Sequence, residues 1–173
     1  MKYVKYIKST VLILAISLIS CDKGMLSDDD NGDTGIFILK SYSKIPGTVH
    51  IDETTAVTYR TPLVNYSGIL SYDSISHVFT LSERAIDKIK DLKVPVNGLP
   101  FAFKIDGKII YTAYLWPGFS SATCDWMAAD PIMAEFYGGL KINLGYPGDM
   151  PGVADRRNDS RIIDLFRTDN RLK

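Results

Sequence analysis

The chain has few of the residues that usually staple small proteins or carry their chemistry. Among its 173 residues are only two cysteines, Cys21 and Cys124, so a fold held by several disulfides is excluded. Its two histidines, His50 and His77, lie far apart in the sequence and make a poor zinc set with a single thiol. Lys and Arg number 20 and Asp and Glu also number 20, so the chain has no overall field that would attract nucleic acid.

Motifs that mark catalytic and cofactor sites are missing as well. Ser120 and Ser121 do not lie in a Gly-x-Ser-x-Gly elbow, and the glycines of residues 145–160 are not followed by the Gly-Lys-Ser/Thr of a phosphate loop. The acidic residues 28–33 suggest a calcium loop, but its twelfth position falls on Ile38, where a bidentate Glu is needed. The sequence therefore predicts no catalytic residue, no metal site and no cofactor.

The longest apolar run lies close to the N-terminus. Residues 11–19 are dominated by Leu and Ile, Lys2, Lys5 and Lys8 precede them, and Cys21 follows almost at once. The run is shorter than the roughly 20 apolar residues that cross a bilayer as a helix. A basic start, a short apolar stretch and a small-residue ending are typical of a secretory signal.

The last four residues of this segment, Leu18-Ile19-Ser20-Cys21, resemble the lipobox of bacterial lipoproteins. The resemblance implies that residues 1–20 are a signal peptide that is removed, and that Cys21 is acylated and becomes the new N-terminus. Two or three acyl chains hold a protein firmly on a membrane, whereas one chain holds it only marginally. We therefore expect a soluble domain that is anchored to the outer membrane through lipid on Cys21.

An acidic tether is expected between Cys21 and the domain, over residues 21–34. The segment contains five aspartates and a single lysine, and a segment of this composition cannot bury a core. Within it, Ser27-Asp28-Asp29-Asp30 is similar to the short acidic signal that sends some outer-membrane lipoproteins to the cell exterior. A solvated linker explains the same residues, so periplasmic and surface orientations both stay open. Residues 35–173 have the size of a single globular domain.

Short strands and few helices are predicted for this domain. A capping box at Thr80-Leu81-Ser82-Glu83 and apolar residues at helical spacing predict one helix that ends before Pro95. Asp159-Ser160 caps a second helix over residues 161–167. Strands are expected at residues 35–40, 48–51, 56–59, 66–72 and 77–81. The fold class is therefore α+β, a mostly antiparallel sheet with one or two covering helices.

The strongest local signal is a hairpin around Asp106-Gly107. Asp-Gly supplies the positive φ angles of a two-residue turn, which places Phe103 opposite Ile110 and Phe101 opposite Thr112. Residues 78–113, a strand, a capped helix and this Asp-Gly-Lys hairpin, resemble the periplasmic β-α-β-β piece of the SecD-type translocase subunit. Because the chain lacks that family's membrane helices, the resemblance implies local topology and no translocase function.

The segment after the hairpin is the best candidate for a functional surface. Aromatic side chains gather there and offer flat apolar faces with a polar edge, which suits sugar rings or a partner protein. The candidate ligand-binding residues are Tyr111, Tyr114, Trp116, Phe119 and Trp126. The alternative is that these residues pack in the core, and we expect at least one of the two tryptophans to do so.

We expect a non-catalytic binding or structural module at the outer membrane or cell surface. Its partners would be the membrane, through the lipid anchor, and a glycan or protein of the envelope, with no role for nucleic acid. The alternative is a small envelope hydrolase that uses Cys124 or a nearby serine. A catalytic thiol needs a histidine within hydrogen-bond reach and a lowered pKa, so the surroundings of Cys124 separate the two hypotheses.

Overall fold

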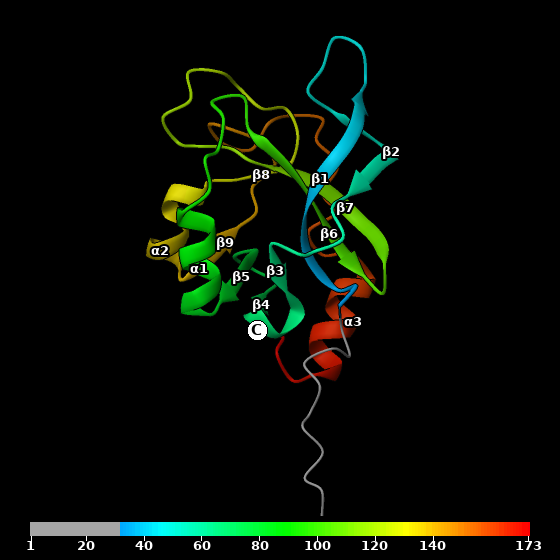
Figure 1. Ribbon diagram of the computed structural model, residues 1–173, viewed down its shortest axis with the longest axis vertical. Coiled ribbons are helices and arrows are strands. Elements are labelled where there is room, and N and C mark those ends of the chain that lie inside the picture. Colours follow the sequence, from blue (N-terminus) through cyan, green and yellow to red (C-terminus); the bar gives the residue numbers. More distant parts are fainter. Residues whose placement is uncertain (1–31) are drawn as a thin grey trace, which may run out of the picture.

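Strands make up most of the regular structure. The structure is a computed structural model that describes residues 32–173 (Figure 1). The predicted signal peptide, the predicted lipidation site Cys21 and the segment Ser27-Asp28-Asp29-Asp30 lie outside the described residues. Within them, three α-helices accompany two sheets whose strands are mostly antiparallel, so the predicted α+β class is confirmed.

The Asp106-Gly107 turn joins the two central strands of the larger sheet. β6 (Leu99–Ile105) and β7 (Lys108–Leu115) pair antiparallel on either side of it. Asp106 has a φ of 48° and Gly107 a φ of 76°, the positive angles that a two-residue hairpin turn requires. The backbone N–H of Asp106 donates to Thr34 Oγ1 (3.0 Å), which fixes the turn to the start of the described chain.

The predicted register of this hairpin is wrong beyond its first two pairs. Lys104 pairs with Ile109 as a two-residue turn demands, but Phe103 pairs with Tyr111 and Phe101 with Ala113. One extra residue on β7 therefore forms a β-bulge next to the turn, and it shifts every later pair by one position.

The larger sheet also contains β1 (Gly35–Lys44), β2 (Ile51–Thr58), β3 (Val64–Asn65) and β8 (Ala128–Ala129). Its strand order is β2-β1-β6-β7-β8, and β3 also pairs with β1. Only the β7–β8 pair is parallel. Two strands were predicted, over residues 48–51 and 56–59, but β2 is one continuous strand. Asp52 lies inside this strand. Its Oδ1 accepts from the N–H of Thr54 (3.0 Å), in a stretch where the ladder with β1 is irregular.

The smaller sheet has the order β4-β5-β9, with β4 (Ile69–Asp73), β5 (Val78–Leu81) and β9 (Gly139–Lys141). Residues 66–68, predicted as part of a strand, form the 3₁₀ turn η1 (Tyr66–Gly68), because the Asn65 side chain accepts from the N–H of Gly68 and caps it. A Cβ at Gly139 would lie 1.9 Å from the carbonyl oxygen of Phe79, so only glycine lets β9 approach β5 this closely.

Two apolar clusters lie on opposite faces of the central hairpin. The main core contains the inner faces of both sheets and the apolar side of the last helix, and Phe103 stacks on Phe79 across the sheets (5.0 Å between ring centroids). The second cluster contains Ala102, Tyr114 and Trp116. Since β6 and β7 bury side chains on both faces, the hairpin is the centre of the domain.

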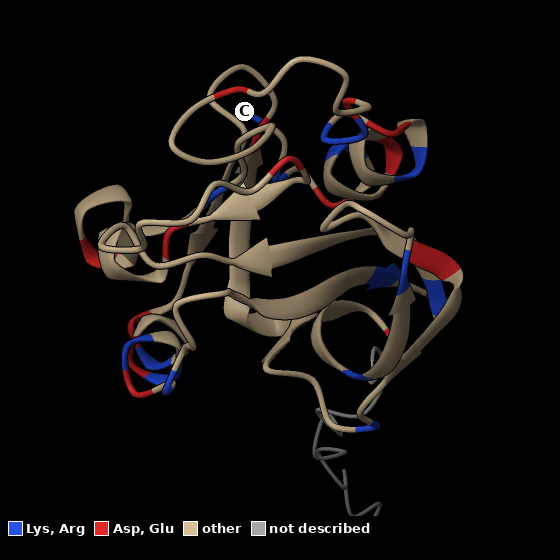
Figure 2. Cartoon of the chain, turned by 90° about the horizontal axis from the view of Figure 1, so that it is seen from above, with Lys and Arg blue, Asp and Glu red and all other residues tan. Residues whose placement is uncertain are grey.

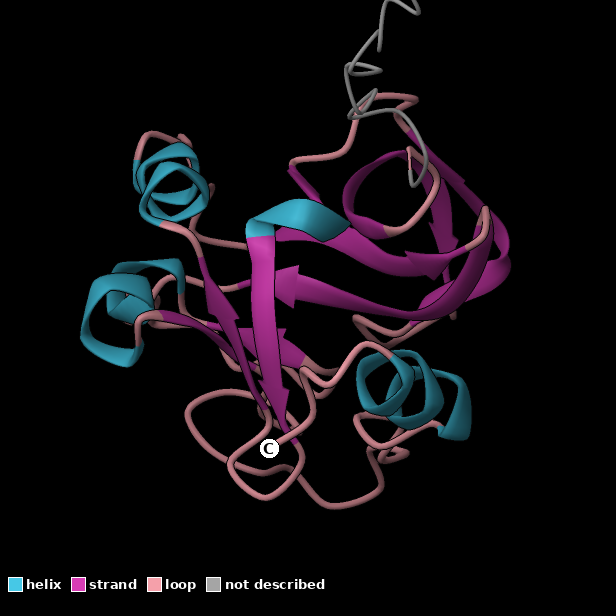
Figure 3. Cartoon of the chain, turned by 90° about the horizontal axis from the view of Figure 1, so that it is seen from below, coloured by secondary structure: helices cyan, strands magenta, loops and turns pink. Residues whose placement is uncertain are grey.

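Two helices pack side by side on one flank of the sheets and the third lies on the opposite flank (Figure 3). α1 (Glu83–Lys90) is the helix predicted from the capping box, but its cap is Ser82, whose Oγ accepts from the N–H of Ala85. α2 (Ala134–Tyr137) follows the 3₁₀ turn η2 (Pro131–Met133). α3 (Ser160–Thr168) begins after Asp159, as predicted.

The strand, helix and hairpin over residues 78–113 occur in the expected order, as β5, α1, β6 and β7. β5, however, pairs with β4 and β9 in the smaller sheet and not with the hairpin. Charged residues of both signs are interspersed over helices and loops around the sheets (Figure 2). Among residues 32–173, no helix is long and apolar enough to span a membrane.

A partly buried ion pair closes the open edge of β7. Among residues 32–173, β8 covers this edge only at Tyr114 and Leu115, which leaves residues 108–113 without a neighbouring strand on this side. Glu53 of β2 fills the gap: its Oε1 accepts from the N–H of Thr112 (2.7 Å) and from the Thr112 hydroxyl (3.1 Å). Arg156 donates to the other Glu53 oxygen and to the carbonyl of Ile110, so side chains replace the missing strand.

We expect Glu53→Ala to lower the free energy of unfolding by about 1–3 kcal/mol, because the buried N–H of Thr112 loses its acceptor. Glu53→Gln is the matched control, since its side-chain oxygen still accepts that bond, and it should cost less. Urea unfolding of the three proteins measures the difference. An unchanged midpoint for Glu53→Ala would show that the edge of β7 does not depend on this side chain.

Candidate functional site

Three of the five candidate aromatic residues lie in the core. Tyr111, Tyr114 and Trp116 are at most 2% exposed. The Trp116 indole packs edge-on against Tyr114 (5.8 Å between centroids) and donates to the carbonyl of Ala122 (3.3 Å). A Cβ at Gly98, which has a φ of 79°, would lie 2.5 Å from the Trp116 ring, so glycine makes room for the indole. These three residues offer no surface to a ligand.

Trp126 is half-buried and its polar edge is occupied. Its indole N–H donates to Thr112 Oγ1 (3.1 Å), and its ring packs against the ring of His50 (4.8 Å between centroids). His50 Nε2 lies 3.3 Å from Asp125 Oδ2. The indole therefore connects the strand β7 to the chain around His50, and its N–H is not free for a ligand.

Cys124 is sealed from solvent, and its surroundings favour the protonated thiol. It is 0% exposed, and its Sγ donates to the carbonyl of Trp126 (3.4 Å). Burial raises the pKa of the Cys124 thiol to about 11, against an ordinary value of 9.0. At neutral pH the thiol is therefore protonated, whereas nucleophilic attack requires the thiolate.

The histidines and the serine that a catalytic site here would need have other partners. His50 faces Asp125, and His77 Nδ1 lies 3.3 Å from the hydroxyl of Tyr72. The hydroxyl of Ser120 donates to the carbonyl of Val96 (2.7 Å). Among the described residues, no histidine thus forms a hydrogen bond with Cys124 or Ser120. Residues 32–173 also contain no group of His, Cys, Asp or Glu side chains that could hold a metal ion.

We expect native Cys124 to react with iodoacetamide far more slowly at pH 7 than the same residue in urea, because it is buried and its pKa is raised. In the unfolded chain the thiol ionises near its ordinary pKa of 9.0, whereas in the folded chain it ionises near 11. Burial of the neutral thiol therefore contributes fully to the free energy of unfolding below about pH 9, and this contribution falls as the pH rises toward 11. Mass spectrometry after timed alkylation measures the rate. Equal rates for the native and the unfolded chain would contradict a sealed thiol.

Phe119 is the only one of the five candidate aromatic residues that is exposed, with 68% of its surface accessible to solvent. The loop that carries it is held from several sides. The N–H of Ser120 donates to Pro117 (2.9 Å), and the hydroxyl of Tyr146 donates to the carbonyl of Gly118 (2.6 Å). An exposed phenyl ring on a fixed loop can contact a partner with little loss of conformational entropy.

Phe119 lines an apolar pocket of about 390 Å³, which we call the Phe119 pocket. Its walls come from the C-terminal end of α1, the chain after it, the loop after β7 and the turn η2. Lys90 and Glu135 close one rim with a salt bridge (2.9 Å). The apolar residues of the lining are Ile89, Leu92, Val94, Pro117, Phe119, Pro131 and Ile132.

Exposed apolar side chains occur in this pocket and in the segments that continue from it. Ile132, which lines the pocket, is 55% exposed. Phe136, which follows the rim residue Glu135, is 78% exposed, and Val96, whose carbonyl accepts from Ser120, is 55% exposed. Single exposed apolar residues are ordinary, whereas several of them beside an apolar pocket mark interaction surfaces. The sequence did not identify Phe136 and Ile132 as surface residues of a site, because the short segment 131–137 shows no apolar periodicity. The only local signal there is the Asp130-Pro131 pair, which is typical of the start of a turn.

Comparisons with protein families, with curated proteins and with solved structures found no match to this chain. The geometry of the described residues is therefore the ground for a functional assignment.

Proposed function

We propose that the chain is a membrane-anchored cell-envelope lipoprotein whose domain binds a partner protein through the Phe119 pocket, without catalysis. The observation that carries the binding proposal is the pocket itself: an exposed phenyl ring, apolar walls and a charged rim. Aromatic anchors in apolar pockets with polar rims dominate the energetics of protein interfaces.

A protein partner suits this surface better than a glycan. Sugar recognition uses an open aromatic face flanked by hydrogen-bonding groups. Trp126 does not offer such a face, because its indole packs on His50 and donates to Thr112. The walls of the Phe119 pocket are mainly aliphatic, which suits an inserted apolar side chain. A polar group of the partner can contact the rim pair of Lys90 and Glu135 and so fix the orientation of the inserted side chain.

The lipid anchor is proposed from the lipobox-like residues at Cys21, and the position of the pocket is compatible with it. The described chain enters at the lower end of β1, where the carbonyl of Asp33 accepts from Gly107 (3.0 Å). The loop that follows β7 lies at the opposite, upper end of the molecule (Figure 1). On a tether to a membrane, the domain would thus present the Phe119 pocket away from its attachment point.

Site-specific photo-cross-linking tests the proposal in intact cells. Replacing Phe119 by p-benzoylphenylalanine keeps an aromatic ring at the pocket, and we expect discrete cross-linked adducts on illumination. The matched control places the same residue at Ile75, which is 88% exposed in the turn between β4 and β5, and should give none. An identical adduct pattern at both positions, or none at position 119, would contradict a partner at this pocket.

A further inference from the structure

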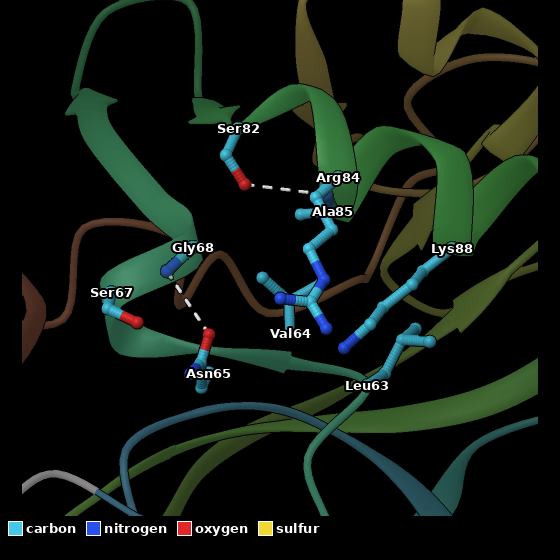
Figure 4. A pocket seen from close by; sticks show the side chains of 9 residues that line it. All are labelled: Leu63, Val64, Asn65, Ser67, Gly68, Ser82, Arg84, Ala85 and Lys88. Carbon is cyan, nitrogen blue, oxygen red and sulfur yellow. Dashed lines mark hydrogen bonds between the residues drawn. The ribbon is translucent and has the colours of Figure 1, made fainter. Parts of the chain in front are cut away.

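A second pocket lies on the other side of α1, between the helix and the segment that contains β3 and η1 (Figure 4). Its volume is about 270 Å³. Val64 and Ala85 are buried and form its floor. Of the polar residues around them, Ser82 is half-buried, and the exposed ones are Asn65, Ser67, Arg84 and Lys88. The lining consists of Leu63, Val64, Asn65, Ser67, Gly68, Ser82, Arg84, Ala85 and Lys88.

Two cations converge on this pocket. Arg84 and Lys88 are four positions apart on α1, so they share one face of the helix, and Figure 4 shows both side chains extending from α1 toward the strand that carries Val64. Like charges at this spacing repel each other. Lys90 of the same helix has Glu135 as its partner, but in the described part of the chain neither Arg84 nor Lys88 forms a salt bridge.

The acidic residues of α1 do not relieve this repulsion within the pocket. Glu83 and Asp87 belong to the helix but do not line the pocket, and no other carboxylate among residues 32–173 lines it. The lining therefore carries two positive charges and no negative one. An anion between Arg84 and Lys88 would remove the repulsion and gain two charge-assisted hydrogen bonds.

Neutral donors lie on the facing wall. The oxygen of the Asn65 side chain is occupied by the N–H of Gly68 (3.2 Å), which leaves its NH₂ group to act as a donor. The Ser67 hydroxyl is exposed at the same wall, and it makes no hydrogen bond to another described residue. The pocket thus combines a guanidinium, an ammonium, an amide and a hydroxyl, which are all donors.

We propose that this pocket binds a phosphate group, either as the free ion or as a monoester, through Arg84 and Lys88. A phosphate dianion matches the two positive charges, and its tetrahedral oxygens can accept from the planar fork of Arg84 and from Lys88 together. A carboxylate carries one charge and has fewer acceptor positions. The site is separate from the Phe119 pocket and goes beyond the binding of a partner protein.

The neighbouring surface indicates how a monoester would extend beyond the phosphate. Leu63 lines this pocket and also a more open apolar depression of about 530 Å³. That depression is lined by Ile38, Tyr59, Arg60, Thr61, Pro62, Leu63, Leu92 and Leu99. An apolar group attached to the phosphate would lie against Leu63 and Tyr59.

Isothermal titration calorimetry of the detergent-solubilised full chain at low salt tests the proposal with three probes: inorganic phosphate, phenyl phosphate and acetate. We expect both phosphates to bind more tightly than acetate. Tighter binding of phenyl phosphate identifies a monoester as the ligand, and equal binding of the two phosphates identifies the free ion. Either result supports a phosphate site, whereas no heat from either phosphate at about 10 mM would overturn it.

Charge-removing variants show whether binding occurs at the pocket. Arg84→Gln and Lys88→Gln should each weaken phosphate binding about tenfold or more, since each removes a charged hydrogen bond. Lys93→Gln is the matched control, because it removes the same charge from an exposed position just beyond α1 that does not line the pocket. Equal losses in all three variants would reduce the effect to general electrostatics and contradict the site. Phe119→Ala should bind phosphate as the wild type does, which separates this test from the proposed partner interface.

Discussion

A Cys21→Ser variant is expected to lose its acyl chains and to move from the membrane fraction to the soluble fraction. In the lipoproteins that the leader resembles, the thiol of this residue is the acyl acceptor, and serine cannot replace it. Each buried methylene contributes about 0.8 kcal/mol to membrane binding, so losing two or three chains removes essentially all of the anchoring. Mass spectrometry of the mature N-terminus and detergent phase partitioning measure the two effects.

The chain provides its own control for this experiment. Cys124 is the only other cysteine, and it is buried in the domain. Cys124→Ser should therefore leave acylation and membrane partitioning unchanged, whatever it does to stability. An unmodified Cys21 in the wild-type protein, or cleavage at a different bond, would refute the lipoprotein proposal.

The parts of the fold that were predicted correctly are those with strong local determinants. Asp106-Gly107 determines the central hairpin through its positive φ angles, and a polar cap next to a periodic apolar face determines α1 and α3. Local rules also gave the α+β class. These signals act over a few residues, so they can be read without knowledge of the rest of the chain.

The errors arose where distant parts of the chain decide the local structure. The bulge in β7 coincides with the side chains of Glu53 and Arg156, which satisfy its backbone from far away in the sequence. Likewise, the separation of β5 from the hairpin depends on β9, a three-residue strand that only the packing of Gly139 makes possible. The sequence around β7 therefore gives no sign of Glu53 or Arg156, and the sequence around β5 gives no sign of β9.

The candidate site was predicted in part, for the same reason. The aromatic segment after the hairpin does contain the exposed Phe119, but composition alone could not separate it from the buried Trp116, three positions earlier. The remaining walls of the Phe119 pocket come from α1 and η2, which tertiary packing brings together. A sequence can thus indicate a surface residue without indicating the pocket that gives it a role.

Trp116→Ala should destabilise the domain by about 3–5 kcal/mol, because it removes a fully buried indole together with its packing on Tyr114. That loss is a large part of the 5–15 kcal/mol by which a domain is usually stable. Phe119→Ala is the matched variant: its ring is 68% exposed, so the free energy of unfolding should change by no more than about 0.5 kcal/mol. Urea unfolding followed by the fluorescence of Trp126, which both variants retain, measures the two values.

The same pair of variants separates folding from binding. Phe119→Ala should weaken binding of the cross-linked partner by about 2 kcal/mol or more while the fold persists, as expected of an interface anchor. For Trp116→Ala, any loss of binding should follow the unfolded fraction and disappear under conditions that restore the fold. A Trp116→Ala protein that unfolds at the wild-type midpoint would remove this indole from the core. If Phe119→Ala instead unfolded as early as Trp116→Ala, the phenyl ring would be part of the fold, and the Phe119 pocket would lose its claim to be a binding surface.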